Sequence, residues 1–423
     1  MSDKKITVAI IGAGGRGLNA HGQFIAGHPE LNVEVVAVAD PKPDRLELAR
    51  RMFPNLNDEM VFTDFQTLLD RGKIADAVVI ATMEDTHAPI AVACAQMGCH
   101  ILLEKPMAPT AEACRLIVNE AKKAGVIFAV CHVLRYSQYY QKIRSLIAKG
   151  TLGDIAHIQH NEEISYWHYT HSFVRGHNCN SDRTSFALLS KSCHDVDIIR
   201  YLLGKRCQTV QSFGGLLHFC KSGKPAKAGD AVRCTECPHE PSCPFSAMKI
   251  YVRKGVNIGA DAMPGESISR KLSDEELMVA LKTGRFGRCV YECDNNVVDH
   301  QVVNFAYEGG ATAAFTLGAF TDGDRKTIVQ GSKGMIRGSL ATGQIQRYDF
   351  LTDTWHDESP DDPTARGGHG GGDRGLMSQW IEAIRSGDQY KIITGPDETL
   401  ETHLTAFAAE QSRLDGQVKT VEY

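Results

Sequence analysis

A glycine-rich turn near the start of the chain has the spacing that brings phosphate groups to the backbone. Gly12, Gly14 and Gly17, with Arg16 inside the group, follow the apolar, strand-like run 6–11. The first glycine allows a tight turn, the second a close approach of a pyrophosphate, and the third close packing of helix on strand. The helix that follows would stabilise the anionic phosphates at its N-terminus. The pattern predicts a dinucleotide-binding site.

An acidic residue supports this interpretation and indicates which dinucleotide binds. Asp40 ends a second apolar run, 33–39. It lies about 20 residues beyond the glycines, where a carboxylate accepts hydrogen bonds from a ribose 2′-hydroxyl. Because a carboxylate repels a 2′-phosphate, Asp40 favours NAD over NADP. A purely structural glycine turn is the alternative, but the strand, the glycines, the helix and the acid occur in the expected order.

A lysine at the end of another strand has the position to carry the chemistry. Glu104, Lys105 and Pro106 follow the apolar run 100–103, and open α/β sheets bind ligands beyond the carboxyl ends of their strands. An amine beside a nicotinamide could orient a substrate hydroxyl and take its proton as hydride leaves. The other interpretation is a surface lysine paired with a surface glutamate. The dinucleotide pattern before it favours the catalytic one.

A second polar group comes at the start of a predicted helix with one apolar face. His194 lies in the first turn and could relay a proton from the reacting hydroxyl, while a capping and packing role is the alternative. Lys191 lies beside it. A cluster of Lys105, Lys191 and His194 would be electropositive, which could lower a lysine pKa, stabilise an alkoxide or bind a carboxylated sugar.

The stretch 166–176 is dense in aromatic, histidine and arginine residues, among them Trp167 and Arg175. Such residues suit stacking on a sugar ring and hydrogen bonding to its hydroxyls. A packed aromatic edge is the alternative. We expect Trp167 and Arg175 to contact substrate.

The cysteines indicate a metal site. There are thirteen, an odd number, so a complete disulfide framework is not expected. Cys234, Cys237 and Cys243 have the spacing of a metal knuckle within a loop-rich segment, about 221–281, that looks inserted. Tetrahedral zinc needs a fourth ligand, and the sequence does not choose among Cys193, His239, Cys220 and Cys179. Free thiols without metal and an iron–sulfur site are the alternatives to a structural zinc.

These motifs together resemble the Gfo/Idh/MocA oxidoreductase family, whose members include glucose–fructose oxidoreductase and inositol dehydrogenases. The resemblance rests on the glycine pattern, Asp40, Glu104-Lys105-Pro106 and the later His194-Asp-Val-Asp197, and it covers nearly the whole chain. It implies a Rossmann domain at 1–133 and an α+β domain with a large, mostly antiparallel sheet at 134–423. It also implies that Lys105 is catalytic.

The resemblance assigns further residues. Thr82 and His87, in a loop after a strand, with Glu104 and His132, would contact the cofactor. Expected on the substrate side are Arg135, Tyr136, Asp195 and His369, the last in the glycine-rich run 366–375. Ser190 stands where many relatives carry an Asp, so the sequence departs from their Asp–His relay.

The remaining expected elements complete the second domain. Residues 288–339 read as strands, with a hairpin of 297–305 and 311–317 and a short strand at 289–291. A helix at about 399–414 is expected to pack back near the dinucleotide domain.

Composition limits the partners. The 423 residues are 43% hydrophobic and 23% charged with net charge −5, which is typical of a soluble globular protein. No apolar run reaches the ~20 residues of a membrane helix, and no basic run suits nucleic acid or an anionic membrane. The N-terminus shows no secretory pattern, so we expect a cytoplasmic protein. A large sheet usually has a second subunit on its exposed face, so we expect a homodimer or higher homo-oligomer.

Three functions remain open. The first is an NAD-dependent oxidoreductase that transfers a hydride between nicotinamide and a secondary hydroxyl, or ketone, of a sugar, glycoside or polyol. The second is a redox-neutral glycosidase in which tightly bound NAD oxidises the sugar, permits elimination and returns the hydride. The third is a cofactor-binding regulatory protein, which the intact Glu104-Lys105-Pro106 disfavours.

Overall fold

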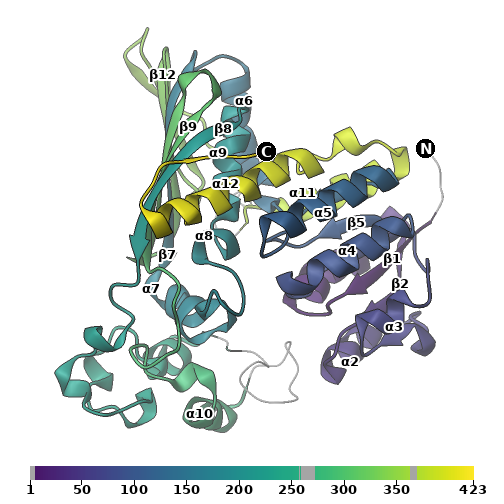
Figure 1. Ribbon diagram of the computed structural model, residues 1–423, viewed down its shortest axis with the longest axis horizontal. Coiled ribbons are helices and arrows are strands. Elements are labelled where there is room, and N and C mark those ends of the chain that lie inside the picture. Colours follow the sequence, from purple (N-terminus) through teal and green to yellow (C-terminus); the bar gives the residue numbers. More distant parts are fainter. Residues whose placement is uncertain (1–4, 257, 259–271, 363–368) are drawn as a thin grey trace.

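The computed structural model describes residues 5–256, 258, 272–362 and 369–423. They form two sheets with helices around and between them (Figure 1). The first sheet has the strand order β3-β2-β1-β4-β5-β6 and every pair is parallel, which confirms the predicted Rossmann fold. Its strands are β1 (Ile6–Ile11), β2 (Val33–Ala39), β3 (Val61–Phe62), β4 (Ala77–Ile80), β5 (His100–Leu103) and β6 (Phe128–Val130).

The strands of this sheet are almost continuously apolar because both faces are covered. On one face, α4 (His87–Gln96) and α5 (Ala111–Ala124) pack on residues such as Val78 and Ile101. Helix α5 is capped at both ends: the side chain of Thr110 accepts a hydrogen bond from the backbone N–H of Ala113, and Gly125 has φ +65°. Three further helices of this domain are α1 (Gln23–Gly27), α2 (Pro43–Met52) and α3 (Phe65–Leu69).

The second sheet has nine strands in the order β14-β13-β12-β11-β7-β10-β9-β8-β15. In the described chain only β7 and β10 pair in parallel, which confirms the predicted, mostly antiparallel sheet. Its strands are β7 (Ile155–Ser165), β8 (Cys207–Gly215), β9 (His300–Tyr307), β10 (Thr312–Thr321), β11 (Asp324–Gly331), β12 (Gly334–Ser339), β13 (Gln344–Asp349), β14 (Thr354–Asp357) and β15 (Lys419–Thr420).

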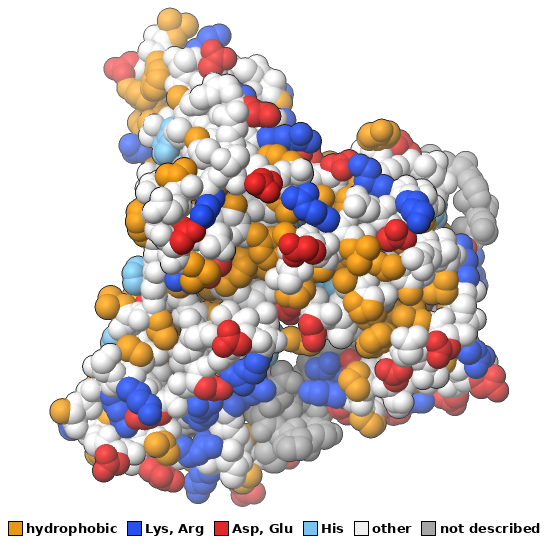
Figure 2. Space-filling model, viewed as in Figure 1, with side chains coloured by type: hydrophobic (Ala, Val, Ile, Leu, Met, Phe, Trp, Pro, Cys, Tyr) orange, Lys and Arg blue, Asp and Glu red, His pale blue; other side chains and the backbone are white. Residues whose placement is uncertain are grey.

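One face of this sheet forms the main core and the other is open. Buried and exposed residues alternate along β9 and β10, as expected for a half-buried sheet. The buried face packs on α6 (Gln138–Ala148) and α9 (Cys193–Leu203). The open face carries exposed apolar side chains, among them Phe213 and Val302. Hydrophobic side chains are visible at the left margin of Figure 2, where Figure 1 places this sheet.

The C-terminal helices join the two domains. Helix α11 (Gly372–Ser386) places Leu376, Trp380 and Ile381 in the core of the Rossmann sheet. Helix α12 (Pro396–Asp415) lies beside α5 (Figure 1), as the sequence predicted. The last part of the chain thus contributes to the core of the first domain, so the two domains are not simply consecutive in sequence. The domain boundary at 133/134 stays a prediction.

The inserted segment has little core of its own. Its described part consists of single turns and α10 (Asp274–Thr283) around a small apolar cluster that includes Ile250 and Leu281. The strand predicted at 289–291 is wrong: these residues form a turn, next to one isolated bridge between Arg233 and Arg288. No described helix is both long and apolar enough to cross a membrane.

Candidate active site

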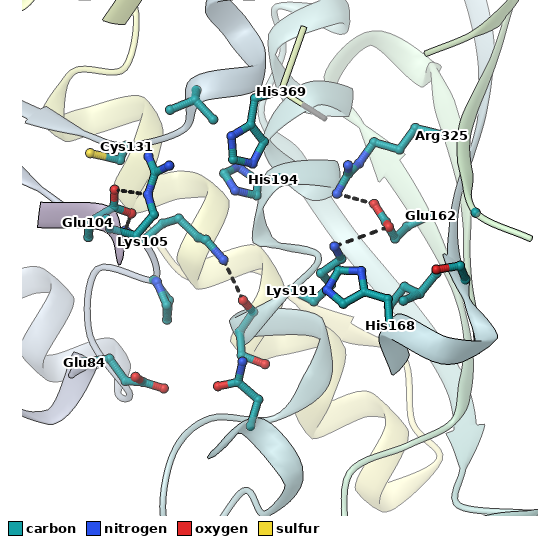
Figure 3. Close-up of a pocket in the computed structure, with 18 of the residues that line it drawn as sticks. Glu84, Glu104, Lys105, Cys131, Glu162, His168, Lys191, His194, Arg325 and His369 are labelled. Carbon is teal, nitrogen blue, oxygen red and sulfur yellow. Dashed lines mark hydrogen bonds and ion pairs between the residues drawn. The ribbon is translucent and has the colours of Figure 1, made fainter. Parts of the chain in front are cut away.

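A cavity of about 580 Å³ lies between the two domains, at the carboxyl ends of β4 and β5 (Figure 3). Loops after Rossmann strands form one wall, and β7 with the start of α9 forms the other. The predicted site residues that line it are Arg16, Thr82, Glu104, Lys105, Lys191, His194 and His369. Prediction from sequence therefore identified residues on both walls.

Lys105 projects from the Rossmann wall across the cavity (Figure 3). Its Nζ donates a hydrogen bond to the backbone oxygen of Ser190 at 2.9 Å. That bond fixes the amine between the two domains and leaves its other hydrogens for a ligand. His194 faces it from α9 and is 4% exposed, and Nδ1 has no hydrogen-bond partner among the described residues. Burial, helped by the charge of Lys105, lowers the pKa of His194 well below its usual value, so the ring is neutral.

Glu104 ties the strand end to the glycine turn. Arg16 Nε lies 2.7 Å and His21 Nε2 lies 2.8 Å from the same carboxylate oxygen of Glu104. Burial opposes ionisation, but the charge of Arg16 and the hydrogen bond from His21 hold the pKa of Glu104 well below its usual range. Arg16 also binds Asp373 at 2.6 Å, and Asp373 binds His369 Nδ1 at 2.8 Å. A chain of polar contacts therefore runs from the glycine turn to His369, just before α11.

Sequence analysis did not single out Glu162, His168 or Arg325 of the second wall, although His168 lies in the stretch 166–176. Glu162 lies on β7 between Lys191, whose Nζ is 3.6 Å from its carboxylate, and Arg325, with which it forms an ion pair (Figure 3). Burial lowers the pKa of Lys191, against the attraction of Glu162. Burial also lowers the pKa of His168 to about 3. This wall offers a substrate two cations, a carboxylate and a neutral imidazole.

The cofactor side fits a dinucleotide. Gly12 has φ +96°, and a Cβ there would lie 2.4 Å from the backbone oxygen of Ala81, so only glycine fits. At Gly14 the nearest atom to an added Cβ is Nη1 of Arg45 at 3.4 Å, so a ligand can approach the backbone. A Cβ at Gly17 would lie 1.9 Å from the backbone oxygen of Gly12.

Asp40 lies at the carboxyl end of β2 and is fixed by its neighbours. It accepts backbone hydrogen bonds from Ala13 at 2.8 Å and from Lys42 at 2.9 Å. Arg45, which sequence analysis did not single out, pairs with it at 3.2 Å. The carboxylate is thus held beside the glycine turn, where a ribose hydroxyl would reach it.

Two predicted cofactor contacts are corrected. His87 is 1% exposed and does not line the cavity; Nδ1 lies 3.0 Å from the backbone oxygen of Pro106, so the ring supports the loop that carries Lys105. His132 is fully buried behind His194, with ring centroids 5.6 Å apart, and burial lowers its pKa to about 3. Both side chains therefore pack behind residues that line the cavity and do not line it themselves.

Arg135 and Tyr136, predicted to contact substrate, are turned into the protein. The guanidinium of Arg135 forms two 2.7 Å bonds to Asp197 and a further ion pair with Glu398. The hydroxyl of Tyr136 lies 2.9 Å from Thr394 Oγ1. Neither lines the cavity, because tertiary partners distant in sequence occupy their polar atoms.

Three further residues that were predicted to contact substrate do not line the cavity, because other parts of the protein contact their side chains. Asp195 is buried beneath the wall, 2.7 Å from Arg325 Nε and 3.1 Å from His160 Nε2. Trp167 packs against the inserted segment, where Lys254 Nζ lies 5.7 Å from its ring centroid. Arg175 is 2% exposed in the same region and donates to the backbone oxygen of Arg288 at 2.8 Å. None of the three lines the cavity.

The cysteine site stays a prediction, but the structure brings its first three residues together. Cys234, Cys237 and Cys243 line one small cavity of about 10 Å³ away from the active-site candidate. Cys193 is wrong as their fourth partner: it begins α9 and is buried in the main core. The run 366–375 is described only from His369 onward; 363–368 lies outside the described residues, as do 257 and 259–271 of the inserted segment.

Comparisons with known proteins decide the family. A model of an oxidoreductase family with an NAD-binding Rossmann fold matches residues 6–132, and a model of the C-terminal alpha/beta domain of that family matches 144–422. The chain belongs to the Gfo/Idh/MocA oxidoreductase family. YteT of Bacillus subtilis strain 168, which is named only as an oxidoreductase, is 25% identical over 86% of each chain.

Other members of the family have more specific names. Myo-inositol 2-dehydrogenase of Thermotoga maritima is 26% identical over 46% of this chain and 55% of its own. Among solved structures, a levoglucosan dehydrogenase in complex with NADH and levoglucosan has a TM-score of 0.71 at 16% identity, covering 99% of this chain and 100% of that one. At that identity the likeness shows the fold.

Proposed function

We propose that this Gfo/Idh/MocA protein is an NAD-dependent dehydrogenase of sugars, glycosides or polyols. It would transfer a hydride between nicotinamide and a carbon that bears a secondary hydroxyl, or the corresponding ketone. The observation that carries the proposal is Lys105 Nζ, held by Ser190 in the cavity between the glycine turn and a charged second wall. Relatives named for inositol and levoglucosan point to the same substrate class.

The glycine turn and Asp40 would hold the cofactor. The open backbone at Gly14 would receive the pyrophosphate, and Asp40 would bind the adenosine ribose. Thr82, at the end of the neighbouring strand, lines the cavity where the other half of the dinucleotide would lie. Bound NAD supplies the hydride acceptor.

Lys105 would manage the proton of the substrate hydroxyl. The bond to Ser190 orients the amine, and a further N–H or the lone pair can face the reacting oxygen. Neutral His194, with His369 at a ring-centroid distance of 5.9 Å, lies on the opposite side and would receive or pass the same proton. Lys191 would assist by keeping the developing alkoxide in a positive field.

Glu162 and Arg325 would bind the remaining hydroxyls. An ion pair at a cavity wall presents an acceptor and a donor at fixed separation, which suits neighbouring hydroxyls of a polyol. The predicted substrate contact His369 lines the same space. These charged groups, and not Trp167 or Arg175 of the stretch 166–176, would therefore set substrate preference.

The test is one assay with two readouts. Purified protein is incubated with NAD and a panel of sugars, inositols and nitrophenyl glycosides while NADH and nitrophenol are followed together. NADH formation without nitrophenol is the expected result. Nitrophenol release without net NADH would refute the dehydrogenase proposal and establish the redox-neutral glycosidase instead. No NAD binding at all would refute both.

We also propose that a second copy of the chain covers the open face of the nine-stranded sheet. Phe213 and Val302 are cross-strand partners there, 50% and 42% exposed. An apolar pair on an open sheet face is typical of a subunit interface. Light scattering after size exclusion should give a dimer or larger, and Phe213→Glu with Val302→Glu should give a monomer. A monomeric wild type would contradict the proposal.

A further inference from the structure

Four cysteines converge on the small cavity beside the inserted segment. Cys234, Cys237, Cys243 and Cys289 all line it. The first three come from consecutive turns, and Cys289 comes from a separate segment that crosses them. The backbone holds the two segments together, because Cys289 N–H donates to the backbone oxygen of Val232 at 2.8 Å next to the bridge between 233 and 288. Cys289 is therefore positioned where the predicted knuckle lacked a ligand.

Within the described part of the chain, a buried arginine beside these thiols has no carboxylate partner. Arg175 is 2% exposed and forms no ion pair with a carboxylate in the described part of the chain. Its Nη2 lies 3.5 Å from Cys234 Sγ and 2.8 Å from the backbone oxygen of Phe245, and its Nε donates to the backbone oxygen of Arg288. Burying a cation without a counter-charge costs free energy, so an anionic group at the cysteines would stabilise this guanidinium.

We propose that Cys234, Cys237, Cys243 and Cys289 bind one structural zinc ion and that Arg175 balances its charge. Four thiols that release four protons to solvent give a tetrathiolate centre with net charge −2. Arg175, a buried cation that hydrogen-bonds one of the sulfurs, would compensate part of this charge. This inference does not depend on the proposed function.

The thiols must move inward to bind. No three of their sulfur atoms lie within 4.8 Å of one another in the described chain, whereas a zinc–sulfur bond is about 2.3 Å. Cys237 and Cys243 are only half-buried and directly follow one-turn helical segments, so the proposal requires their side chains to rotate toward the cavity.

Other potential ligands fit less well. His239 also lines the cavity, but it is half-buried and turned toward Ser242, with Nδ1 3.4 Å from that hydroxyl. Cys293 donates to the backbone oxygen of Cys289 at 3.3 Å and does not line the cavity. Cys220 contacts Ser222, and Cys179 lies beside Arg183. Cys289 is the lining thiol that completes a set of four.

A zinc ion here would support the second wall of the active-site candidate. Phe245, two residues after Cys243, packs against Tyr166 with ring centroids 6.4 Å apart, and Lys249 lies over the same ring. Tyr166 begins the helical turn that carries His168 into the cavity. The inserted segment has only a small apolar cluster of its own. A metal ion bound by its cysteines would supply a cross-link that stabilises it.

The experiment measures zinc in the whole protein purified from zinc-supplemented medium. We expect about one zinc per chain in the wild type and near none in Cys289→Ser, with Cys220→Ser as the matched control in the same segment. Cys193→Ser and His239→Ala should keep their zinc. Stoichiometric zinc in Cys289→Ser would overturn the ligand assignment. A folded wild type that holds no zinc, or that holds iron with sulfide, would overturn the zinc centre.

A second measurement covers the case in which Cys289→Ser fails to fold. Wild-type protein stripped with a thiol-blocking mercurial and reloaded with Co²⁺ after thiol release should show sulfur-to-cobalt charge-transfer absorption and the d–d bands of a tetrahedral thiolate site. Stripping should also lower the melting temperature. Octahedral cobalt spectra would refute the tetrathiolate centre, and so would an unchanged melting temperature.

Discussion

Replacing Lys105 by methionine removes the amine while keeping the length of the side chain. The Nζ atom makes one described hydrogen bond, to Ser190, so its loss costs the fold about 1 kcal/mol, a small part of a typical 5–15 kcal/mol. Catalysis should suffer more. A positioned acid–base group contributes roughly 10²–10⁴-fold, or about 3–5 kcal/mol of barrier. We therefore expect kcat to fall by about that factor with the melting temperature nearly unchanged.

The same variant should still bind cofactor. Neither Asp40 nor the glycine turn contacts Lys105 in a described hydrogen bond, so the Kd for NADH, measured by fluorescence, should change less than about threefold. Lys123→Met, on an exposed lysine, is the control for expression and handling. Turnover within tenfold of the wild type would refute the proton-handling role. A large loss of NADH binding would show instead that Lys105 holds the cofactor.

Three further results are expected. Asp40→Ser should lower kcat/KM with NAD about tenfold or more and raise it with NADP, because Arg45 then faces a 2′-phosphate; an unchanged cofactor ratio contradicts this. Arg135→Met should destabilise the protein by about 3–5 kcal/mol in urea unfolding, since buried Asp197 loses its partner, while KM of the folded enzyme stays similar. Burial lowers the pKa of His132 to about 3, so below about pH 6.5 the unfolded chain binds a proton that the folded protein does not. As the pH is lowered from 6.5 to 5, the unfolding free energy should then fall by about 1.4 kcal/mol per pH unit for each such histidine. A melting temperature that stays the same over this pH range would contradict the prediction.

Local patterns predicted the cofactor side of the molecule well. Strands β1, β2 and β5, the need for Gly12 and Gly17, and Lys105 at a strand end all follow from short-range rules on apolar runs, turns and strand ends. These rules act within a few residues, so one sequence suffices. The same holds for the hairpin of β9 and β10, whose turn lies at Glu308–Gly310.

The second wall needed long-range information. Glu162 pairs with Arg325, 163 positions away, and residue type alone does not reveal such a partner. One signal was available: Ile158, His160, Glu162 and Ile164 occupy alternate, buried positions of β7. A carboxylate at an inward-facing position of a strand must meet a cation or a ligand. Period-two analysis of polar as well as apolar residues would therefore have identified Glu162.

The buried arginines show why residue type predicted substrate contacts poorly. Arg135, Arg175 and Arg325 look alike in the sequence, yet each has a different partner. Arg135 is neutralised by Asp197 and Glu398 inside the core, and Arg325 by Asp195 and Glu162 at the cavity wall. Arg175 alone of the three has no carboxylate among the described residues, and a thiol is its nearest acidic group. Since a buried charge must be balanced, that difference separates a structural ion pair, a cavity wall and the proposed thiolate metal centre.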